Sequence, residues 1–312
     1  MTTIASRRRR RSLFRGGSLW VLAVPAVIFF GVFSYAPLVG LQVAFKDFSI
    51  TKGIFGSPWN GLENFRFFFE SGNAGRIITN TLFLNTLFIV ATIVTAIALA
   101  LWINEIARKP LRRFVQSAVF LPYFISPIVI SIMLQAFLSG VGGQGGIVNQ
   151  VLNVFALPTV AWYSEPGPWP YILTVVKVWQ LAGYYSVIYL AAITAIPEEL
   201  YEAAVLDGAT RGQIALRVTL PFLVPVTVIL VMLSVGRIFF GDFGTIYAIV
   251  GDNGVLYPTT DVIDTYVFRS LRTSGDFGMT AAIGLFQSLV GFVLVASAAL
   301  ISRRITRETS LF

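Results

Sequence analysis

Long apolar runs separated by short polar segments dominate the pattern of this chain. A transmembrane helix requires about 20 consecutive, mostly apolar residues. Six stretches meet this requirement, and they are residues 18–43, 78–103, 113–138, 171–195, 219–246 and 278–302. The pattern therefore predicts an all-α membrane protein with six transmembrane helices.

The first apolar stretch follows a basic run, as the apolar region of a secretory signal peptide also does. It is longer than the apolar region of about 7–15 residues in signal peptides, and no convincing small-residue cleavage site follows it. A twin-arginine signal in RRRRRSLF is a weaker alternative. We interpret residues 18–302 as a six-span domain, preceded by a basic cytoplasmic tail (1–17) and followed by a cytoplasmic tail (303–312).

The distribution of Lys and Arg predicts the orientation, because cytoplasmic segments of membrane proteins carry an excess of positive charge. With a cytoplasmic N-terminus, 15 of the 23 Lys and Arg residues lie in cytoplasmic segments and 6 lie outside. We therefore expect a multi-pass membrane protein with both termini in the cytoplasm. The net charge of +8 is then a topology signal. A nucleic-acid partner is not expected, because no basic stripe alternates with aromatic residues on a soluble segment.

Composition excludes several kinds of chemistry. Hydrophobic residues make up 56% of the chain and charged residues 12%, and there is no Cys or His. Disulfides, Cys-based metal sites and Ser-His-Asp triads are therefore impossible. No G-x-x-x-x-G-K-[ST] phosphate loop occurs, so we expect no cofactor in this chain and no ATP hydrolysis by it. The GVGGQG stretch follows a membrane span rather than a strand, and we interpret it as a flexible turn.

The polar stretch 196–221 lies between the fourth and fifth spans, on the cytoplasmic side by the predicted orientation. Pro197 suits a first helical position, and the glutamates after it are favoured near the positive end of the helix dipole. One face of this helix contains Leu200, Ala203, Ala204 and Asp207. Its two methyl groups permit close approach of another surface, which favours protein docking. A linker lying on the lipid surface is the alternative, disfavoured by the acidic face because the inner leaflet is negative.

The same stretch contains signals for a helix end and a second helix start. Gly208 fits the left-handed position that ends a helix. Thr210 followed by Gln213 matches a capping box, and Pro221 marks the start of the next span. The stretch therefore predicts two short helices joined by a tight turn.

The letters EAAVLDGATRGQIALRVTLP (202–221) resemble the EAA loop of membrane-spanning subunits of binding-protein-dependent ABC importers. The matching positions are Glu202, Ala203, Ala204, Asp207, Gly208, Ala209, Leu220 and Pro221. Val218 replaces the usual Ile, and Gly212 and Ala215 stand near places where the family often has aromatic residues. The resemblance implies that the first helix is a coupling helix seated in a groove of an ATPase, with Glu202 and Gly208 as its most secure positions.

Four further segments resemble maltose-type sugar permeases, in the branch that serves oligosaccharides released from complex polysaccharides: VAFKDFSITKGIFGSPWNGLENF, LPYFISPIV, YLAAITAIPEELYEAA and DVIDTYVFR. The resemblance implies the ABC type I importer permease fold. It also implies a second permease subunit (a heterodimer), two ATP-binding subunits that bind ATP and Mg, and an extracytoplasmic solute-binding protein. An ATP-independent secondary transporter or channel, and a membrane-embedded enzyme, remain alternatives.

Charged residues inside the predicted spans indicate where a ligand passes. Lys177 lies in the fourth span, and Arg237 and Asp242 lie in the fifth, all toward the outside. A charge near the bilayer centre costs at least ~2.5 kcal/mol and usually faces a cavity or a partner. The predicted pathway residues are Lys177, Trp179, Gln180, Tyr184, Arg237 and Asp242. Pairing with a partner subunit, snorkelling of the cations and ordinary packing of the aromatic residues are the alternatives.

The stretch TTDVIDTYVFRS predicts a short helix outside the membrane. Asp261 is expected as its N-cap and Asp264 as a partner of its dipole. Contact with the solute-binding protein is the alternative interpretation of these acidic residues.

Overall fold

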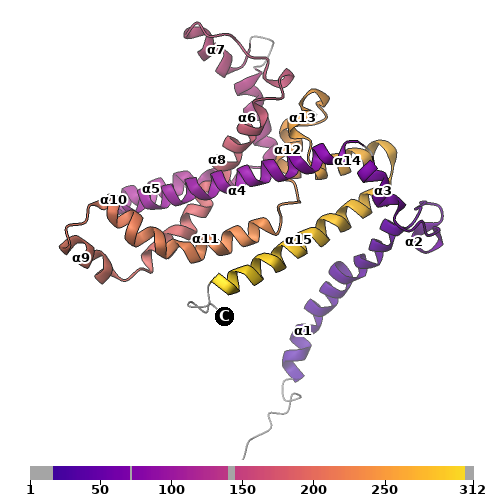
Figure 1. The fold of residues 1–312 in the computed structure, drawn as a ribbon, viewed down its shortest axis with the longest axis horizontal. Helices are drawn as coiled ribbons and strands as arrows, with labels where there is room; N and C mark the ends of the chain where they lie inside the picture. Colours follow the sequence, from indigo (N-terminus) through magenta and orange to yellow (C-terminus); the bar gives the residue numbers. More distant parts are fainter. Residues whose placement is uncertain (1–16, 71, 140–144, 306–312) are drawn as a thin grey trace, which may run out of the picture.

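The computed structural model describes residues 17–70, 72–139 and 145–305 (Figure 1). Within these ranges the chain forms helices, and the only β contact is an isolated antiparallel bridge between Lys46 and Trp59. The predicted all-α architecture is therefore confirmed for the described part of the chain. The basic N-terminal tail, most of the GVGGQG stretch and the end of the C-terminal tail lie outside the described residues.

The helices follow one another along the chain with short connections. The N-terminal half contains α1 (Gly17–Phe30), the π-helical η1 (Gly31–Tyr35), the 3-10 helix η2 (Ala36–Phe45), α2 (Gly53–Gly56), α3 (Glu63–Glu70), α4 (Ala74–Asn104), α5 (Lys109–Phe120), η3 (Leu121–Phe124), α6 (Pro127–Leu138) and α7 (Ile147–Val154). The C-terminal half contains η4 (Trp162–Ser164), α8 (Trp169–Thr194), α9 (Glu198–Leu206), α10 (Arg211–Ile214), the π-helical η5 (Ala215–Thr219), α11 (Leu220–Val235), α12 (Phe243–Val250), η6 (Gly254–Leu256), α13 (Tyr257–Thr260), α14 (Ile263–Ser274) and α15 (Phe277–Ile305).

Among the described residues, four helical segments are long and apolar enough to cross a membrane, or up to six if each of two bent pairs is one span. The four segments are Leu22–Phe45, Ala74–Asn104, Arg211–Val235 and Phe277–Leu300. The bent pairs are α5–η3 with α6, and α8 with α9. Most predicted spans thus correspond to helices, although two of them are not continuous.

The predicted span 113–138 is wrong as a single straight helix, because α5–η3 and α6 meet at 98°. Ser126 is extended, with φ −68° and ψ 149°, and it precedes Pro127. A proline disfavours helical geometry in the residue before it and suits the first position of a new helix. The Ser126 hydroxyl accepts a hydrogen bond from the Val129 N–H at 3.4 Å, which caps that new helix.

The predicted span 219–246 is also wrong, because α11 ends at Val235 and α12 begins only at Phe243. Residues 236–242, here called the break, contain two glycines. A Cβ at Gly241 would lie 2.7 Å from a methyl carbon of Val262, so the chain passes too close to α14 for a larger residue. Arg237 and Asp242, predicted inside a continuous helix, therefore lie in and at the end of this break.

Two amide side chains satisfy backbone carbonyls in the break. Asn85 of α4 donates to the Ile238 carbonyl at 2.9 Å and to the Phe240 carbonyl at 3.2 Å. Gln287 of α15 donates to the Phe239 carbonyl at 2.8 Å. Non-helical backbone at membrane depth is tolerated where such partners replace the missing helical bonds. The break is therefore a braced element rather than a frayed helix end.

Helices α4, α8 and α11 form a tightly packed core. Ala96 and Ala100 of α4 are fully buried and lie one turn apart, against Tyr189 of α8 and Leu223 of α11. Small residues let helix backbones approach closely in a membrane. This core fixes the relative positions of α4, α8 and α11.

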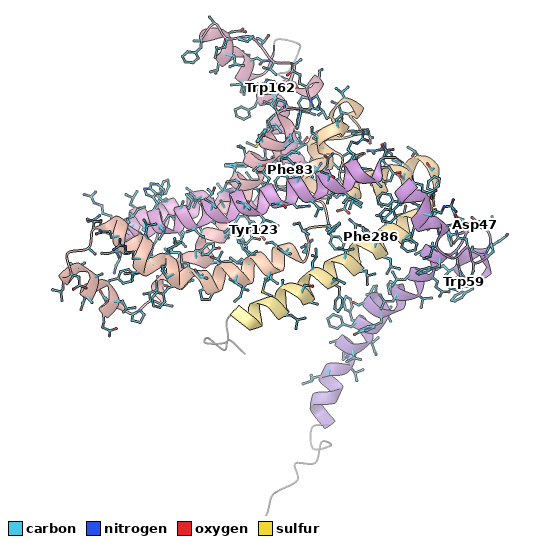
Figure 2. All side chains as sticks on the ribbon, viewed as in Figure 1. Asp47, Trp59, Phe83, Tyr123, Trp162 and Phe286 are labelled. Atoms are coloured by element: carbon cyan, nitrogen blue, oxygen red, sulfur yellow. The ribbon has the colours of Figure 1, made fainter. Side chains whose placement is uncertain are left out.

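The rod formed by α1, η1 and η2 diverges from this core (Figure 1). None of the most apolar part of Leu22–Phe45 is buried within the chain. Asp47 and Trp59 lie together at the end of the rod, whereas Trp162 lies on a separate projection that carries α7 (Figure 2). The rod therefore presents its apolar surface to lipid or to another subunit.

Candidate functional site

The 196–221 loop folds as two short helices with a glycine turn between them, as predicted. Gly208 has φ +76°, and its N–H donates to the Val205 carbonyl at 3.0 Å. The Ala209 N–H donates to the Ala204 carbonyl at 2.9 Å, which completes a Schellman ending. Thr210 and Gln213 form the predicted capping box at the start of α10. Local sequence signals thus account for the shape of this loop.

The first helix of the loop, α9, is exposed on most of its surface. It leaves α8 at an angle of 76°, and none of its residues is buried. Glu202, Ala203, Asp207 and Gly208 are exposed, while Ala204 and Ala209 are half-buried. Leu206 is 87% exposed. Exposed apolar and acidic side chains together suit contact with another protein better than with a negative lipid surface.

Two polar contacts hold this loop, one within it and one to the residue after α4. The Tyr201 hydroxyl lies 3.2 Å from the Thr219 hydroxyl, across the loop. Arg211 of α10 donates to Glu105 at 3.4 Å, and Glu105 directly follows α4. The loop is therefore linked to the end of α4 and closed on its own Thr219, the residue directly before α11.

A cavity of about 330 Å³ lies between α4, α8, the end of α11 and the break. Its polar lining residues are Asn85, Thr92, Lys177, Tyr185, Ser234, Arg237 and Asp242, and the remainder of the lining is apolar apart from Gly241. The Thr92 hydroxyl is buried and has no hydrogen-bond partner among the described residues. This hydroxyl is a buried polar atom in the wall of the cavity, covered by neighbouring atoms.

The charges predicted in the spans meet at this cavity. Lys177 of α8 forms an ion pair with Asp242. This pairing lies within the chain rather than with a partner subunit, and Asp242 compensates the charge of Lys177. The Arg237 side chain lines the same cavity and forms no ion pair with a described residue. Arg237 is thus the one cation of the lining, among the described residues, without an ion pair.

The other predicted pathway residues do not line the cavity. Trp179 is 42% exposed. Gln180 is buried and donates to the Ile125 carbonyl at 3.3 Å, in the broken span. The Tyr184 ring stacks on Tyr123, with centroids 4.6 Å apart. These three residues lie beside the face of α8 that lines the cavity. The aromatic residue of α8 that does line the cavity is Tyr185.

Sequence reasoning missed the amides Asn85 and Gln287, although each interrupts an otherwise apolar run. Gln287 bonds both the break and the Asp264 carboxylate, at 2.8 Å. Burial raises the pKa of Asp264, while bonds from Gln287 and the Gly241 N–H and the charge of Arg237 partly offset that rise. Asp264 is in the first turn of α14, as predicted for a dipole partner. It therefore joins α14 to the wall of the cavity.

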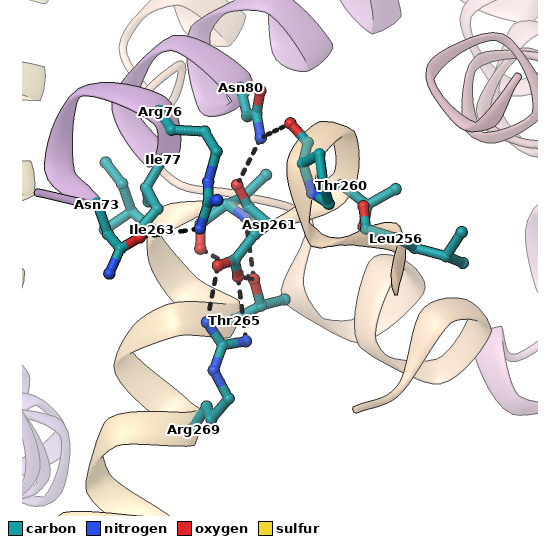
Figure 3. A network of polar contacts seen from close by, with 12 residues as sticks. Asn73, Arg76, Ile77, Asn80, Leu256, Thr260, Asp261, Ile263, Thr265 and Arg269 are labelled. Carbon is teal, nitrogen blue, oxygen red and sulfur yellow. Dashed lines mark hydrogen bonds and ion pairs between the residues drawn. The ribbon is translucent and has the colours of Figure 1, made fainter. Parts of the chain in front are cut away.

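Asp261 belongs to a second polar network, between α4 and α14 (Figure 3). Val262, not Asp261, is the N-cap of α14, so the predicted role of Asp261 is wrong. The Asp261 side chain is fully buried and accepts a bidentate pair from Arg269, at 2.7 and 3.2 Å. Thr265 donates to the same carboxylate at 2.9 Å. A buried carboxylate requires such pairing, and this one takes its partners from the helix it was expected to cap.

Comparison with known proteins identifies the class of this chain. Residues 89–307 match the family described as "Binding-protein-dependent transport system inner membrane component". The chain belongs to this family and is a permease component of a binding-protein-dependent ABC importer. The alternatives of an ATP-independent transporter and a membrane-embedded enzyme are therefore dropped.

Several relatives are similar over nearly the whole chain. The polygalacturonan/rhamnogalacturonan transport system permease protein YteP of Bacillus subtilis (strain 168) is 32% identical over 93% of this chain and 89% of its own length. Protein LplB of the same organism is 29% identical over 95% of this chain and 92% of its own length. A chain in the crystal structure of a bacterial ABC transporter involved in the import of the acidic polysaccharide alginate is 36% identical. That match has a TM-score of 0.85 and covers 94% of this chain and 97% of that chain. The fold is therefore that of an ABC importer permease.

Proposed function

We propose that this chain is one of two permease subunits in an ATP-driven importer of acidic oligosaccharides. It would span the bacterial cytoplasmic membrane six times through residues 18–302, with both tails, 1–17 and 303–312, in the cytoplasm. The family, the apolar helices and the excess of cytoplasmic Lys and Arg support this topology. The pair of α5–η3 and α6 then counts as one span, and α8 forms another, with α9 beyond it in the cytoplasm.

The unpaired Arg237 in the cavity carries the proposal for an acidic cargo. Lys177 and Asp242 pair with each other, so Arg237 is the lining cation that has no ion pair with a described residue, and its charge also acts on the nearby buried Asp264 carboxyl. A guanidinium matches a carboxylate in geometry and charge. Tyr185 adds an aromatic side chain to the lining, which is suited to a sugar ring. The named cargoes of YteP and of the alginate importer support a uronate-bearing substrate.

The 196–221 loop is proposed to receive the work of ATP hydrolysis. Glu202, Ala203, Ala204, Asp207, Gly208 and Ala209 form the proposed coupling surface. The exposure of α9 supports docking to a separate ATPase, since the sequence contains no phosphate loop that could bind ATP and Mg. The links to Glu105 and Thr219 would pass the motion to α4 and α11, which flank the cavity.

The complete importer would contain a second permease, two ATP-binding subunits and a solute-binding protein. A solved relative in complex with an alginate pentasaccharide-bound periplasmic protein is 35% identical to this chain and supports that composition. Within this chain, Lys177, Arg237 and Asp242 are proposed to line the pathway. Gln180 and Tyr184 would act indirectly, by holding the broken span beside it, and Trp179 stays a prediction.

The test measures sugar-stimulated ATP hydrolysis by the importer reconstituted with its partner subunits. Arg237→Gln should raise the KM for a uronate oligosaccharide by roughly 10- to 100-fold, because a hydrogen bond to a charged group contributes ~1.5–3 kcal/mol. The KM for a neutral oligosaccharide of equal length should change little. Arg237→Lys keeps the charge and should recover part of the loss.

Lys52→Gln provides the matched control, since it removes one exposed positive charge far along the chain from the cavity residues. It should leave both KM values unchanged. Equal losses for acidic and neutral sugars after Arg237→Gln would contradict the acidic cargo. Uptake by the reconstituted permeases without any ATPase subunit would contradict the coupling proposal.

A further inference from the structure

A second and larger cavity, of about 500 Å³, lies between α5 and α8 at the end of the bundle that also carries α9 and α10 (Figure 1). One wall contains Lys109, Arg112 and Arg113, from the first two turns of α5. The facing wall contains Val187, Leu190 and Ala191 of α8. The cavity therefore combines a cluster of cations with a hydrocarbon surface.

The three cations have no acidic partner. None of them forms an ion pair with any carboxylate in the described ranges. The nearest acidic residue in the sequence, Glu105, pairs instead with Arg211. Among the described residues, the one side-chain bond that these three cations form is donated by Arg112 to the Asn104 side-chain amide oxygen (Oδ1), at 3.4 Å. That bond holds Arg112 in place without compensating its charge.

This cavity lies on a different side of α8 from the proposed sugar pathway. Val187, Leu190 and Ala191 are centred about 130° around the helix from the cavity-lining Lys177, Leu181 and Tyr185, at 100° per residue. The cationic cavity thus requires an occupant of its own.

We propose that the α5–α8 cavity is a binding site for an anionic phospholipid of the inner leaflet. The phosphate group would lie against Lys109, Arg112 and Arg113, and the glycerol and upper acyl chains against the apolar wall of α8. Basic pockets between transmembrane helices on the cytoplasmic side suit such headgroups. A soluble phosphate has no group for the apolar wall, and a neutral lipid does not compensate the cations. The bound lipid would brace the start of α5 beside the Glu105–Arg211 link to the 196–221 loop.

The test uses the wild-type importer in nanodiscs that contain a photoactivatable phosphatidylglycerol. Cross-links should appear in the peptides 109–116 and 187–194. Phosphatidylglycerol in excess should compete with the label, whereas phosphatidylcholine and soluble glycerol 3-phosphate should not. Label found only elsewhere on the chain, or equal competition by phosphatidylcholine or by glycerol 3-phosphate, would overturn the proposal.

Two variants test the two walls separately, with retained phosphatidylglycerol measured by native mass spectrometry. The triple variant Lys109→Gln, Arg112→Gln, Arg113→Gln should bind at least tenfold more weakly, because each nearby cation strengthens anionic lipid binding by roughly fivefold before screening. Ala191→Trp fills the apolar wall without changing charge and should cause a similar loss.

The controls remove the same charge elsewhere or keep it in place. Arg8→Gln, Arg9→Gln, Arg10→Gln in the N-terminal tail should retain the lipid, as should Arg112→Lys with Arg113→Lys. Lipid retention at the wild-type level in both cavity variants, or an equal loss in the tail variant, would overturn the proposal. These readouts do not depend on the cargo of the importer, so failure here leaves the proposed function intact.

Discussion

Replacement of Asn85 by leucine tests whether the break is braced from α4. Asn85→Leu keeps a similar volume but removes the bonds to the Ile238 and Phe240 carbonyls, which measure 2.9 and 3.2 Å. Side-chain hydrogen bonds within membrane proteins contribute ~0.6 kcal/mol on average. A buried acceptor left without a partner costs ~1–3 kcal/mol. Since Ile238 and Phe240 are only half-buried, the low end applies. The free energy of opening of the break should therefore fall by about 2 kcal/mol in total. This raises the equilibrium constant for its opening roughly 30-fold.

The expected result is local and measurable by amide hydrogen exchange in the assembled importer. Residues 236–242 should open roughly 30-fold more often in Asn85→Leu, in line with the loss worked out from the bonds. Because Arg237 lies in this segment, the KM for an acidic oligosaccharide should rise in the same variant.

Asn80 provides a matched control on the same helix. Its amide also bonds two backbone carbonyls, those of Pro258 and Asp261 at 3.1 and 3.2 Å, but these lie beside α13 and α14. Asn80→Leu should increase amide exchange near Pro258 and Asp261 and leave residues 236–242 protected. The reasoning is refuted if Asn85→Leu exchanges like the wild type, or if the two variants open the same segments.

Three further predictions concern single positions. Gly208→Val should weaken binding of the ATPase subunit in a pull-down. At φ +76° the backbone of a residue with a Cβ is strained by roughly 1–2 kcal/mol. The control variant Gly212→Ala, whose Cβ would lie in open space at an ordinary φ, should bind the ATPase subunit normally. Burial raises the pKa of Asp264 above its ordinary value of 3.8. Between the pKa of the unfolded chain and that of the folded state, the folded state retains a proton that the unfolded chain releases. The stability of the fold therefore falls as the pH rises through this range. Asp264→Asn should flatten that slope in thermal unfolding of the purified chain across the acidic range, and an unchanged slope would contradict the assignment. Gly183→Ala should lower the Tm by more than 1 °C, because the new Cβ would lie 1.8 Å from the Val119 carbonyl oxygen. An unchanged Tm would contradict this and show that α5 can move away from α8.

Local patterns in the sequence predicted much of this protein. The apolar runs located the membrane helices, because burial in lipid demands continuous hydrocarbon over a fixed length. Gly208 and the Thr210–Gln213 pair predicted the shape of the 196–221 loop. Such turn and cap signals act over three or four residues, so they operate in any fold.

The breaks at Ser126 and at 236–242 were not predicted, although Pro127 and the glycines of the break were visible in the sequence. Hydropathy averages over a window, and an apolar segment stays apolar whether it is straight or bent. A break is stable only where other helices satisfy its carbonyls, and Asn85 and Gln287 do so from positions far away in the chain.

The cavity likewise depends on tertiary structure. Lys177 and Asp242 stand 65 positions apart, and their ion pair exists because α8 packs beside the break. The sequence by itself determined that charges stand within apolar segments, which is costly enough to require partners. Only the packing of α4, α8 and α11 decided which charges cancel and that Arg237 remains, because partner choice depends on distances that the order of residues does not contain.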